Sequence, residues 1–377
     1  MKVAILGLGY VGSELLSTIN KNNINVVGYD IDKSKVNALK QKYSVSYKKE
    51  ILNKSSLFIV CVPTPINERH KPDLSFTKKV CKTISDYIQN KPIIVFESTF
   101  YPGVTEDICI KEIEKYSKKK INKDFYVGYS PERYSPGEKK PLSNIDKLVS
   151  ASNKKTANFL KLFYSKFINK VHIVENIKIA ELSKNFENCQ RDLNIALFNE
   201  LFVYCEKLNI DYTKVIKASK TKWNFHPFLP GLVGGHCISV DPYYLIFDSQ
   251  NKKVSFKTLE TSRKINNKFI NYIYHRIKKF LIAENLVRKN ILFYGLTYKP
   301  NTSDLRNSGA KIIYDKLRKD CKNIVSFDPY ITEKSVISSK KFSIIIAMVS
   351  HSDFKRNKKF YRNILVKDGF IFNPFKN

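Results

Sequence analysis

A cysteine in the second half of the chain has neighbours suited to covalent chemistry. Cys237 follows the pair Gly234-Gly235 and precedes Asp241 by four residues. Glycines let a bulky ligand approach the backbone closely, and a thiol is a strong nucleophile once its pKa is lowered. A buried structural cysteine would have the same sequence around it, so Cys237 by itself leaves both interpretations open.

A second pair of residues suits the stabilisation of negative charge. Lys184 and Asn188 are four residues apart in a stretch with helical spacing and no Gly or Pro, from about Glu175 to Ile210. Residues four apart share one face of a helix, so a cation and an amide donor can point at the same oxygen. The alternative is a solvated lysine beside an unrelated polar residue.

A glycine-rich block near the start of the chain predicts a dinucleotide site. Gly7, Gly9 and Gly12 follow a predicted strand and open a predicted helix, where the first permits a tight turn, the second admits the pyrophosphate and the third lets helix and strand pack closely. Asp30 ends the next predicted strand, and a carboxylate there binds ribose hydroxyls and repels a 2′-phosphate. The pattern therefore predicts NAD, the alternative being a structural glycine turn with an incidental acid.

The elements around these residues predict an α/β protein. Short β-branched runs alternate with amphipathic segments at both ends of the chain, which is typical of βαβ units with parallel sheets. We expect two Rossmann-like parallel-sheet domains (1–174 and 276–377) joined by a helical domain (175–275) with a long central helix. The predicted strands are Lys2–Leu6, Asn25–Tyr29, Leu57–Val62, Ile93–Glu97, Phe125–Tyr129, Lys147–Ala151, Ile291–Gly295, Asn323–Phe327, Phe342–Met348 and Gly369–Phe372, with a helix over Ser308–Asp320.

Composition narrows the class of protein further. A chain of 377 residues exceeds the roughly 250–300 at which single cores stop growing. No signal peptide and no apolar run of about 18 residues is found, so we expect a cytoplasmic protein without membrane insertion. The seven cysteines include no CxxC pair, which predicts reduced thiols, no disulfide framework and no metal site.

The formal net charge of +32 is high enough to suggest a polyanion or nucleic-acid binder. However, the lysines are spread over nearly every predicted helix and loop, and no zinc-finger or RNP-type motif accompanies them. We expect a solvated lysine-rich surface and no specific nucleic-acid partner, with polyanion binding as the alternative.

Seven short blocks occur in order along the chain, and together they resemble the UDP-glucose/GDP-mannose dehydrogenase family over essentially its whole length. They are Gly7–Gly12 with Asp30, Val62–Pro65 with Asp73–Ser75, Glu97–Thr99 with Pro102 and Gly103, Ser130–Arg133, Ala180–Lys184 with Asn188, Gly234–Pro242, and Gly295–Ser308.

The resemblance implies a four-electron oxidation in which NAD accepts two hydrides from the C6 hydroxyl carbon of a nucleotide sugar. The thiolate of Cys237 would add to the intermediate aldehyde, the thiohemiacetal would give up the second hydride, and water would release the acid from the thioester. Lys184 and Asn188 would stabilise the oxyanion. Asp241, Glu132 and Thr99 share proton handling and water activation, and which of them is the base is left open.

The resemblance also implies the ligand contacts. Those expected for NAD are Gly7, Gly9, Tyr10, Val11, Gly12, Asp30, Lys35, Pro63, Thr64, Ser98, Thr99 and Arg306. Those expected for the substrate are Glu132, Arg133, Lys184, Asn188, Arg191, Gly231, Gly234 and Lys299. A homodimer through the central helix is expected on the same basis.

The wording of three blocks resembles the branch of the family that acts on UDP-N-acetylhexosamines. After Ser130-Pro-Glu the chain reads Arg133-Tyr-Ser-Pro136-Gly137, where other branches usually have Phe-Leu. The blocks Gly-Gly-His-Cys-Ile and Asn188-Cys-Gln-Arg191-Asp192 resemble the same branch. This predicts UDP-GlcNAc, UDP-GalNAc or UDP-ManNAc, whose uronic acid would normally feed a surface polysaccharide. The alternatives are a UDP-glucose 6-dehydrogenase and a silent nucleotide-sugar binder. Two departures, a shorter approach over Pro230–Gly235 and Ser239 in place of Pro, affect the sugar-nucleotide loop.

Overall fold

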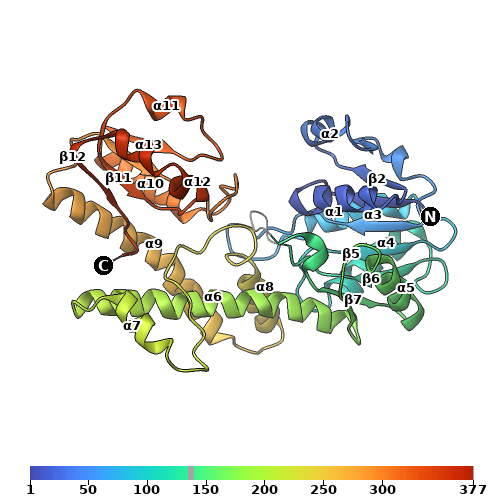
Figure 1. Cartoon of the computed structure of the whole chain (residues 1–377). Coiled ribbons are helices and arrows are strands. Elements are labelled where there is room, and N and C mark those ends of the chain that lie inside the picture. Colours follow the sequence, from blue (N-terminus) through green and yellow to red (C-terminus); the bar gives the residue numbers. More distant parts are fainter. Residues whose placement is uncertain (135–139, 377) are drawn as a thin grey trace. The chain divides into compact units, whose positions relative to one another are not determined.

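The computed structural model describes residues 1–134 and 140–376, and its contacts divide the chain into two compact units (Figure 1). The first comprises Met1–Glu187 and Tyr243–Val254, and the second comprises Asn188–Pro242 and Ser255–Asn377. Ser135, Pro136 and Gly137, which contributed to the predicted sugar, lie outside the described residues. The division into three domains stays a prediction.

The first unit is built on an eight-stranded sheet in the order β3-β2-β1-β4-β5-β6-β7-β8. Its strands are β1 (Val3–Leu6), β2 (Val26–Tyr29), β3 (Val45–Ser46), β4 (Leu57–Val60), β5 (Ile93–Phe96), β6 (Tyr126–Tyr129), β7 (Lys147–Ala151) and β8 (Val171–Ile173). All six predicted strands are present, whereas β3 and β8 were not predicted. The predicted α/β fold with parallel sheets is confirmed. One strand pair differs from the rest: β7 runs antiparallel to β6, and no crossover helix joins them in the described residues.

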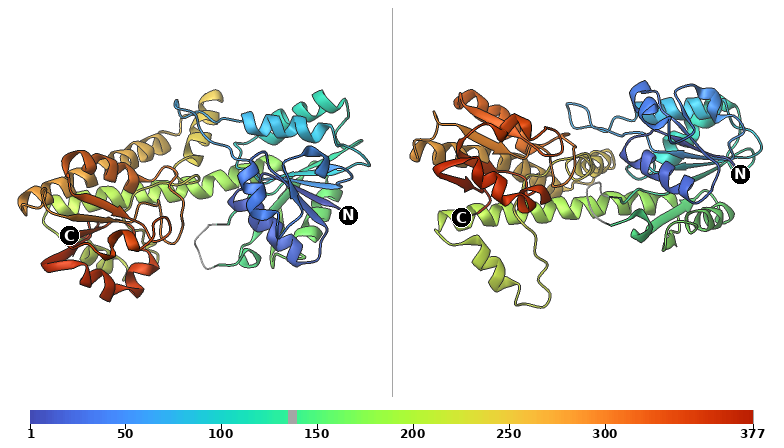
Figure 2. Two further views of the ribbon diagram at one scale, coloured as in Figure 1. Left: turned by 90° about the horizontal axis from the view of Figure 1, so that it is seen from above. Right: turned by 45° about the horizontal axis from the view of Figure 1, so that its top comes forward.

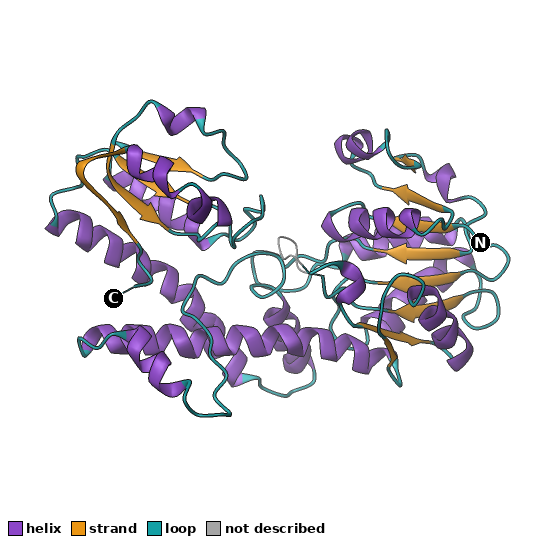
Figure 3. Ribbon diagram, viewed as in Figure 1, coloured by secondary structure: helices purple, strands orange, loops and turns teal. Residues whose placement is uncertain are grey.

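Helices cover both faces of this sheet because its strands are apolar on both sides (Figure 3). In β1, Val3 and Ile5 pack on the face covered by α1 (Tyr10–Lys21), α2 (Lys33–Leu39) and α5 (Lys154–Tyr164). Ala4 and Leu6 pack on the opposite face, covered by α3 (Ser75–Ser85) and α4 (Lys111–Ser117). Shorter helical turns are η1 (Lys49–Leu52), η2 (Val104–Ile110) and η3 (Leu142–Asn144).

The second unit contains a parallel four-stranded sheet in the order β10-β9-β11-β12. Its strands are β9 (Ile291–Tyr294), β10 (Ile324–Phe327), β11 (Phe342–Ala347) and β12 (Leu365–Phe372). One face packs on α9 (Lys257–Ala283) and α10 (Gly309–Asp320), and the other packs on α11 (Ser335–Ser338) and α13 (Lys358–Asn363), with α12 (Ser352–Arg356) just before α13. The four predicted strands and the helix before Asp320 are confirmed.

The predicted long helix is α6 (Ile177–Lys207), whose 31 residues form one unbroken helix in both views of Figure 2. It is followed by α7 (Tyr212–Ser219) and, after an irregular stretch, by α8 (Asp241–Asn251). None of the helices in the described ranges combines the length and apolar character needed to cross a bilayer.

The turn from β1 into α1 depends on two glycines for different reasons. Gly7 has φ of +95°, which disfavours any side chain, and a Cβ on Gly12 would lie 1.9 Å from the carbonyl oxygen of Gly7. A Cβ on Gly9 would meet no atom within 4 Å. Gly12 is therefore required by packing, whereas the space beside Gly9 is open to a ligand.

We expect Gly12→Ala to reduce the free energy of unfolding by roughly 3 kcal/mol or more, because the clash is with backbone. Gly9→Ala should change it by less than about 1 kcal/mol but weaken NAD binding about tenfold or more, because the methyl group occupies the approach of the pyrophosphate. Urea unfolding and NAD titration of both variants test this pair. Equal unfolding curves for the two, or unchanged NAD affinity in Gly9→Ala, would contradict it.

Candidate active site

Cys237 lies in the turns that precede α8, and its side chain is exposed. The other cysteines are buried, except for the half-buried Cys61, and none of the seven forms a disulfide. The backbone N–H groups of Val240 and Asp241 both donate to the carbonyl oxygen of Cys237, at 2.9 and 2.8 Å. The cysteine is thus held one turn before Asp241 on a tightly wound backbone, with its thiol accessible.

Asp241 is the first residue of α8 and is buried together with Asn188 of α6. The side-chain amide of Asn188 donates to Oδ2 of Asp241 at 2.6 Å, so two of the predicted catalytic residues are in direct contact. This bond fixes a carboxylate in the second unit, which also contains Cys237. A carboxylate whose position is fixed in this way is suited to act as an acid or base on a nearby hydroxyl or water.

Lys184, one turn before Asn188 along α6, is almost completely buried. No described residue accepts a hydrogen bond or ion pair from its ammonium group. A buried ammonium group has few ways to offset its lost hydration, so a negatively charged group beside it is strongly favoured. Lys184 therefore suits the predicted stabilisation of an oxyanion.

The predicted dinucleotide loop has the features that an anion requires. Helix α1 begins at Tyr10, and no side chain caps its N-terminus, which is the end of a helix that favours an anion. Asp30, at the end of β2, accepts hydrogen bonds from the backbone N–H groups of Leu8 and Asp32 at 2.7 and 2.9 Å. The loop and the acid are therefore locked to each other, and NAD fits this arrangement.

The other predicted cofactor residues of the first unit are more varied in setting. Lys35 is exposed and pairs with Asp32 at 3.7 Å, while Pro63 is exposed. Ser98 donates to the carbonyl oxygen of Val62 at 2.6 Å, which ties two adjacent strand ends together. Three further predicted residues differ in burial: Thr64 is buried, and Val11 and Thr99 are half-buried.

Glu132 belongs to a buried ionic cluster that the sequence did not predict. The ammonium group of Lys147, the first residue of β7, lies 2.9 Å from Oε2 of Glu97 and 3.3 Å from Oε2 of Glu132. Tyr164 donates to the other oxygen of Glu97 at 2.5 Å, and the backbone N–H groups of Arg133 and Tyr134 donate to Glu132. The reversal of β7 brings Lys147 to the edge of the sheet where these carboxylates lie.

Burial and charge set different protonation behaviour for the two carboxylates. Burial raises the pKa of Glu97 to about 7, against the opposing effect of Lys147. Burial also acts to raise the pKa of Glu132, but Lys147 and the N–H of Tyr134 outweigh it and hold that pKa below its ordinary value. Glu132 is therefore ionised at neutral pH, while Glu97 titrates there. A charged residue at the start of an otherwise apolar predicted strand was the available signal for Lys147.

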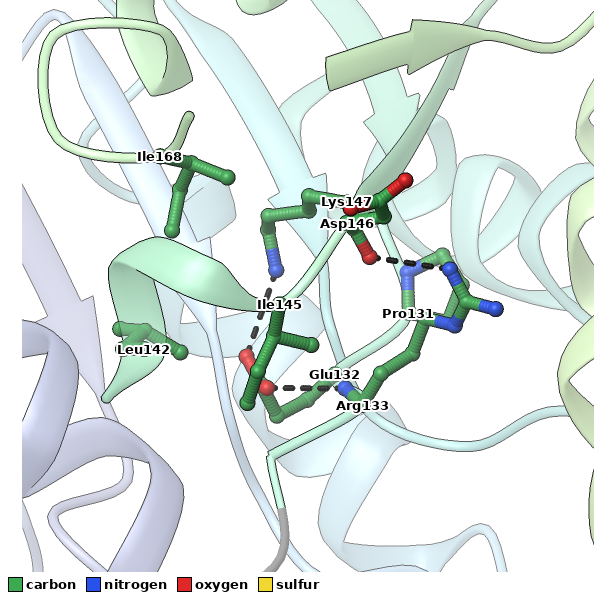
Figure 4. A pocket seen from close by; sticks show the side chains of 8 residues that line it. All are labelled: Pro131, Glu132, Arg133, Leu142, Ile145, Asp146, Lys147 and Ile168. Atoms are coloured by element: carbon green, nitrogen blue, oxygen red, sulfur yellow. Dashed lines mark hydrogen bonds and ion pairs between the residues drawn. The ribbon is translucent and has the colours of Figure 1, made fainter. Parts of the chain in front are cut away.

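Arg133 is engaged by protein groups on both sides of its guanidinium. It forms a forked pair with Glu187 at 3.2 and 2.7 Å and donates to the carbonyl oxygen of Asp146 at 2.9 Å. Figure 4 shows the small pocket beside it, into which the Lys147–Glu132 pair faces. Arg133 thus fastens the segment after β6 to α6, which limits how much of its charge is available to a ligand.

The predicted residues of the second unit lie on three segments. Arg191 is exposed on α6, and Gly231 and Gly234 lie on the irregular stretch before Cys237. Lys299 is half-buried after β9, while Arg306 pairs with Asp304, its Nη2 lying 2.6 Å from Oδ2. The chain therefore groups Asn188, Gly234, Cys237 and Asp241 in one unit, and holds Glu132, Lys184 and the glycine loop in the other.

The turn after β9 repeats the geometry of the turn after β1. Gly295 has φ of +88°, and its N–H donates to the carbonyl oxygen of Phe327 at 2.8 Å, as that of Gly7 does to Tyr29 at 2.9 Å. The two turns therefore have the same relation to the neighbouring strand, β10 in one case and β2 in the other.

The acid beside the second turn is closed to ligands. Asp328 is fully buried, and its Oδ2 accepts from the N–H of Leu296 and from the N–H and hydroxyl of Thr297, with His351 Nε2 at 3.1 Å. Its Oδ1 accepts from the N–H of Tyr330 at 3.0 Å. Asp328 is too buried and too fully bonded to take a ribose hydroxyl, so its role beside this turn is structural.

We expect Lys147→Met to lower the free energy of unfolding by roughly 3–5 kcal/mol, because it leaves two buried carboxylates without their cation. The loss should be larger at pH 8 than at pH 5. The folded pKa of Glu97 lies above its ordinary value of 4.5, so its contribution is fully present below that pH and is lost as the pH rises through about 7. Removing the cation raises both carboxyl pKa values further.

Urea unfolding at the two pH values measures this difference. Lys170→Met, at an exposed lysine of the same unit, is the matched control and should show little loss at either pH. A loss in Lys147→Met that does not change with pH would contradict the electrostatic explanation.

Three family models match the chain in sequence. The NAD binding domain of the UDP-glucose/GDP-mannose dehydrogenase family matches residues 1–52 and 41–168, the central domain matches 178–268, and the UDP binding domain matches 292–375.

Individual proteins agree with these models. The chain is 38% identical to Protein CapL of Staphylococcus aureus, over 98% of this chain and 95% of that protein. It is also 38% identical to UDP-N-acetyl-D-glucosamine 6-dehydrogenase of Salmonella typhi, over 94% and 91%. The solved UDP-D-ManNAc dehydrogenase of Pyrococcus horikoshii superposes with a TM-score of 0.87 at 29% identity, covering 100% of this chain and 96% of that one. The chain therefore belongs to the UDP-glucose/GDP-mannose dehydrogenase family and is an NAD-dependent oxidoreductase.

Proposed function

We propose that this enzyme oxidises the C6 hydroxyl of a UDP-N-acetylhexosamine to a carboxylate through a thioester on Cys237. The observation that carries the proposal is the exposed thiol of Cys237, one turn before a buried carboxylate that Asn188 holds in place. No other described cysteine combines exposure with such a neighbour. A nucleophile followed by a fixed acid–base group is what acyl chemistry at one carbon requires.

The proposed reaction balances in three steps. The alcohol loses a proton and a hydride, which NAD accepts when bound, and becomes an aldehyde. The sulfur of Cys237 forms a bond to the aldehyde carbon while the thiol proton passes to the aldehyde oxygen. The resulting thiohemiacetal then loses a proton, and a second NAD accepts its hydride when bound, which leaves a thioester. Water then adds to the thioester carbon, the C–S bond breaks, the acid leaves and the thiol regains its proton.

The chain's own groups have distinct parts in these steps. The ammonium group of Lys184 stabilises negative charge on the C6 oxygen. It can do so because no described residue accepts a hydrogen bond from it. Asn188 orients Asp241, which is a candidate to take the alcohol proton and to activate water. Glu132, kept ionised by Lys147, and Thr99 remain the other two candidates for the base.

Among the hexosamines, UDP-GlcNAc is the first candidate. The relative named as a UDP-N-acetyl-D-glucosamine dehydrogenase is 38% identical, against 29% for the solved mannosamine enzyme. The chain also spans more than nine-tenths of each of these proteins. We propose the cytoplasm as its location, with seven cysteines outside any disulfide in support.

A panel of UDP-GlcNAc, UDP-GalNAc, UDP-ManNAc and UDP-glucose, incubated with enzyme and NAD, tests the reaction. We expect the fastest NADH formation with UDP-GlcNAc and about two NADH for each sugar oxidised, because an alcohol reaches a carboxylate by losing four electrons. Cys237→Ala should form no uronic acid and bind NAD as the wild type does, since the cofactor loop lies in the other unit.

Cys61→Ala is the matched control, because Cys61 is the other thiol that is not fully buried, and this variant should keep forming acid. Undiminished acid formation by Cys237→Ala would refute the thioester. If none of the UDP-sugars in the panel supports NAD reduction, the whole proposal is refuted. Salt-dependent nucleic-acid binding would then favour the polyanion binder suggested by the net charge of +32.

We also propose that two copies of the chain associate along α6. Six large side chains on this helix are exposed although they are apolar or aromatic, and their spacing of three, four or seven residues sets them in one stripe. They are Ile179, Leu182, Phe186, Leu193, Leu197 and Tyr204. A straight stripe can pair with its own copy about a twofold axis, which makes a second copy the fitting occupant.

Leu197→Lys should convert a dimer into a monomer, because it sets a charge in the middle of the stripe at each copy. Leu162→Lys, at a leucine on α5 that is at least as exposed, is the matched control and should stay dimeric. Light scattering after size exclusion gives the masses. A monomeric wild type, or an unchanged mass for Leu197→Lys, would contradict this interface.

A further inference from the structure

The side chain of Asn199 on α6 is bonded to the backbone of the loop that leads to Cys237. Its Nδ2 donates to the carbonyl oxygen of Gly231 at 3.1 Å, and the N–H of Gly231 donates to its Oδ1 at 2.8 Å. One amide therefore satisfies both polar groups of one residue, as a neighbouring strand would. The segment from 224 to 234 has no helix or strand of its own, so this pair replaces regular structure there.

The orientation of the Asn199 amide is set by a chain of buried groups behind it. Its Nδ2 also donates to Oδ1 of Asn266 at 2.9 Å, and Nδ2 of Asn266 donates to Oδ1 of Asp192 at 2.7 Å. Asp192 accepts further bonds from Arg263 at 2.5 Å and from Ser262 at 2.9 Å. Because a carboxylate only accepts, it leaves each amide in the chain one orientation.

All the side chains in this hydrogen-bonded set are buried. Asp192 and Asn199 have no exposed surface, and Asn266 and Arg263 are 1% and 4% exposed. Polar groups buried to this extent are costly unless each finds its partner, so the set holds together as a unit. The charge pair Arg263–Asp192 anchors it on α9 and α6.

The other end of the same loop is fixed independently. The N–H of Gly235 donates to the carbonyl oxygen of Arg306, and Nδ2 of Asn307 donates to the carbonyl oxygen of Gly235, both at 3.0 Å. A Cβ on Gly234 would lie 2.6 Å from the carbonyl oxygen of Asn307. The loop is therefore held at Gly231 by α6 and at Gly235 by the turn before α10, and Cys237 follows two residues later.

We propose that Asn199 is a positioning residue for the nucleotide-sugar site. It sets the conformation of Gly231–Gly235, and through it the site that this loop forms and the placement of Cys237. It does so without touching the substrate, using an orientation imposed by Asp192 and Arg263. This inference rests on the proposed function, because it takes the loop to be a substrate contact.

The variant Asn199→Asp tests the proposal with almost no change in shape. It removes the Nδ2 group that donates to the carbonyl oxygen of Gly231 and to Oδ1 of Asn266. A carboxylate oxygen then faces these two acceptor oxygens and repels them. We expect the KM for the UDP-sugar to rise about tenfold or more, the effect of losing at least one hydrogen bond. The Kd for NAD should stay within about twofold, since the NAD site lies in the first unit. Asn194→Asp, a half-exposed asparagine on the same helix, is the matched control.

Amide hydrogen exchange gives a readout that does not need turnover. The N–H of Gly231 should exchange faster in Asn199→Asp and in the milder Asn199→Ser than in the wild type or the control. Unchanged exchange in both variants overturns the proposal, as does faster exchange with an unchanged KM for the UDP-sugar.

Failure of the proposed function is a separate result. It would appear as a wild-type enzyme that oxidises no UDP-sugar, whatever the variants do. The Kd for UDP, from calorimetry, then takes the place of the KM. A Kd that is the same in wild type and Asn199→Asp would overturn the positioning role by itself.

Discussion

The buried side of α6 contains several polar residues among apolar ones, and these polar residues are bonded to segments distant in sequence. Glu181 accepts from Gly103 and Thr105, and Asn185 donates to the carbonyl oxygen of Phe100. Further along, Asn188 contacts Asp241, Asp192 contacts Arg263, and Asn199 contacts Gly231. A helix held by these hydrogen bonds cannot shift or rotate by one residue without leaving several buried groups unsatisfied. It therefore fixes the positions of the segments to which it is bonded, including the loop at Gly231 and the start of α8 at Asp241.

Both units use a buried cation in the same way, to hold a group that belongs to the predicted site or leads to it. Lys147 bridges Glu97 and Glu132, and so keeps Glu132 ionised at the end of β6. Arg263 pairs with Asp192, and so fixes the direction of an amide chain that ends on a loop. In each case the charge is compensated where water is excluded, and the group at the other end of the bonded set receives a defined orientation. Removing one partner of such a pair is destabilising because it leaves a buried charge uncompensated.

Much of this arrangement could be predicted from the sequence. The strands, the long helix and the glycine turn follow from hydrophobic periodicity and from residues with one conformational role, such as Gly12. The direction of β7 could not be predicted, because an apolar run has the same pattern in either direction. Cys237 is exposed and Asn188 contacts Asp241, and the catalytic roles of these residues stay predictions. The sequence did not point to Lys147 or Asn199. Their partners are far away in sequence, at Glu97 and Gly231, and only the fold brings them together.

The saturation of Asp328 has a consequence for the order of events in the proposed reaction. With that turn closed, one chain offers the glycine loop beside Asp30 for a dinucleotide, while two hydrides have to be removed from each sugar. Spent cofactor must then leave and fresh cofactor arrive while the sugar is half oxidised. The lifetime of that intermediate has to exceed the time of reloading, and a free aldehyde could diffuse away in the interval. A covalent bond to the sulfur of Cys237 would retain the half-oxidised sugar until fresh cofactor has bound. The exposed thiol therefore meets a need that arises because the second turn takes no dinucleotide ribose.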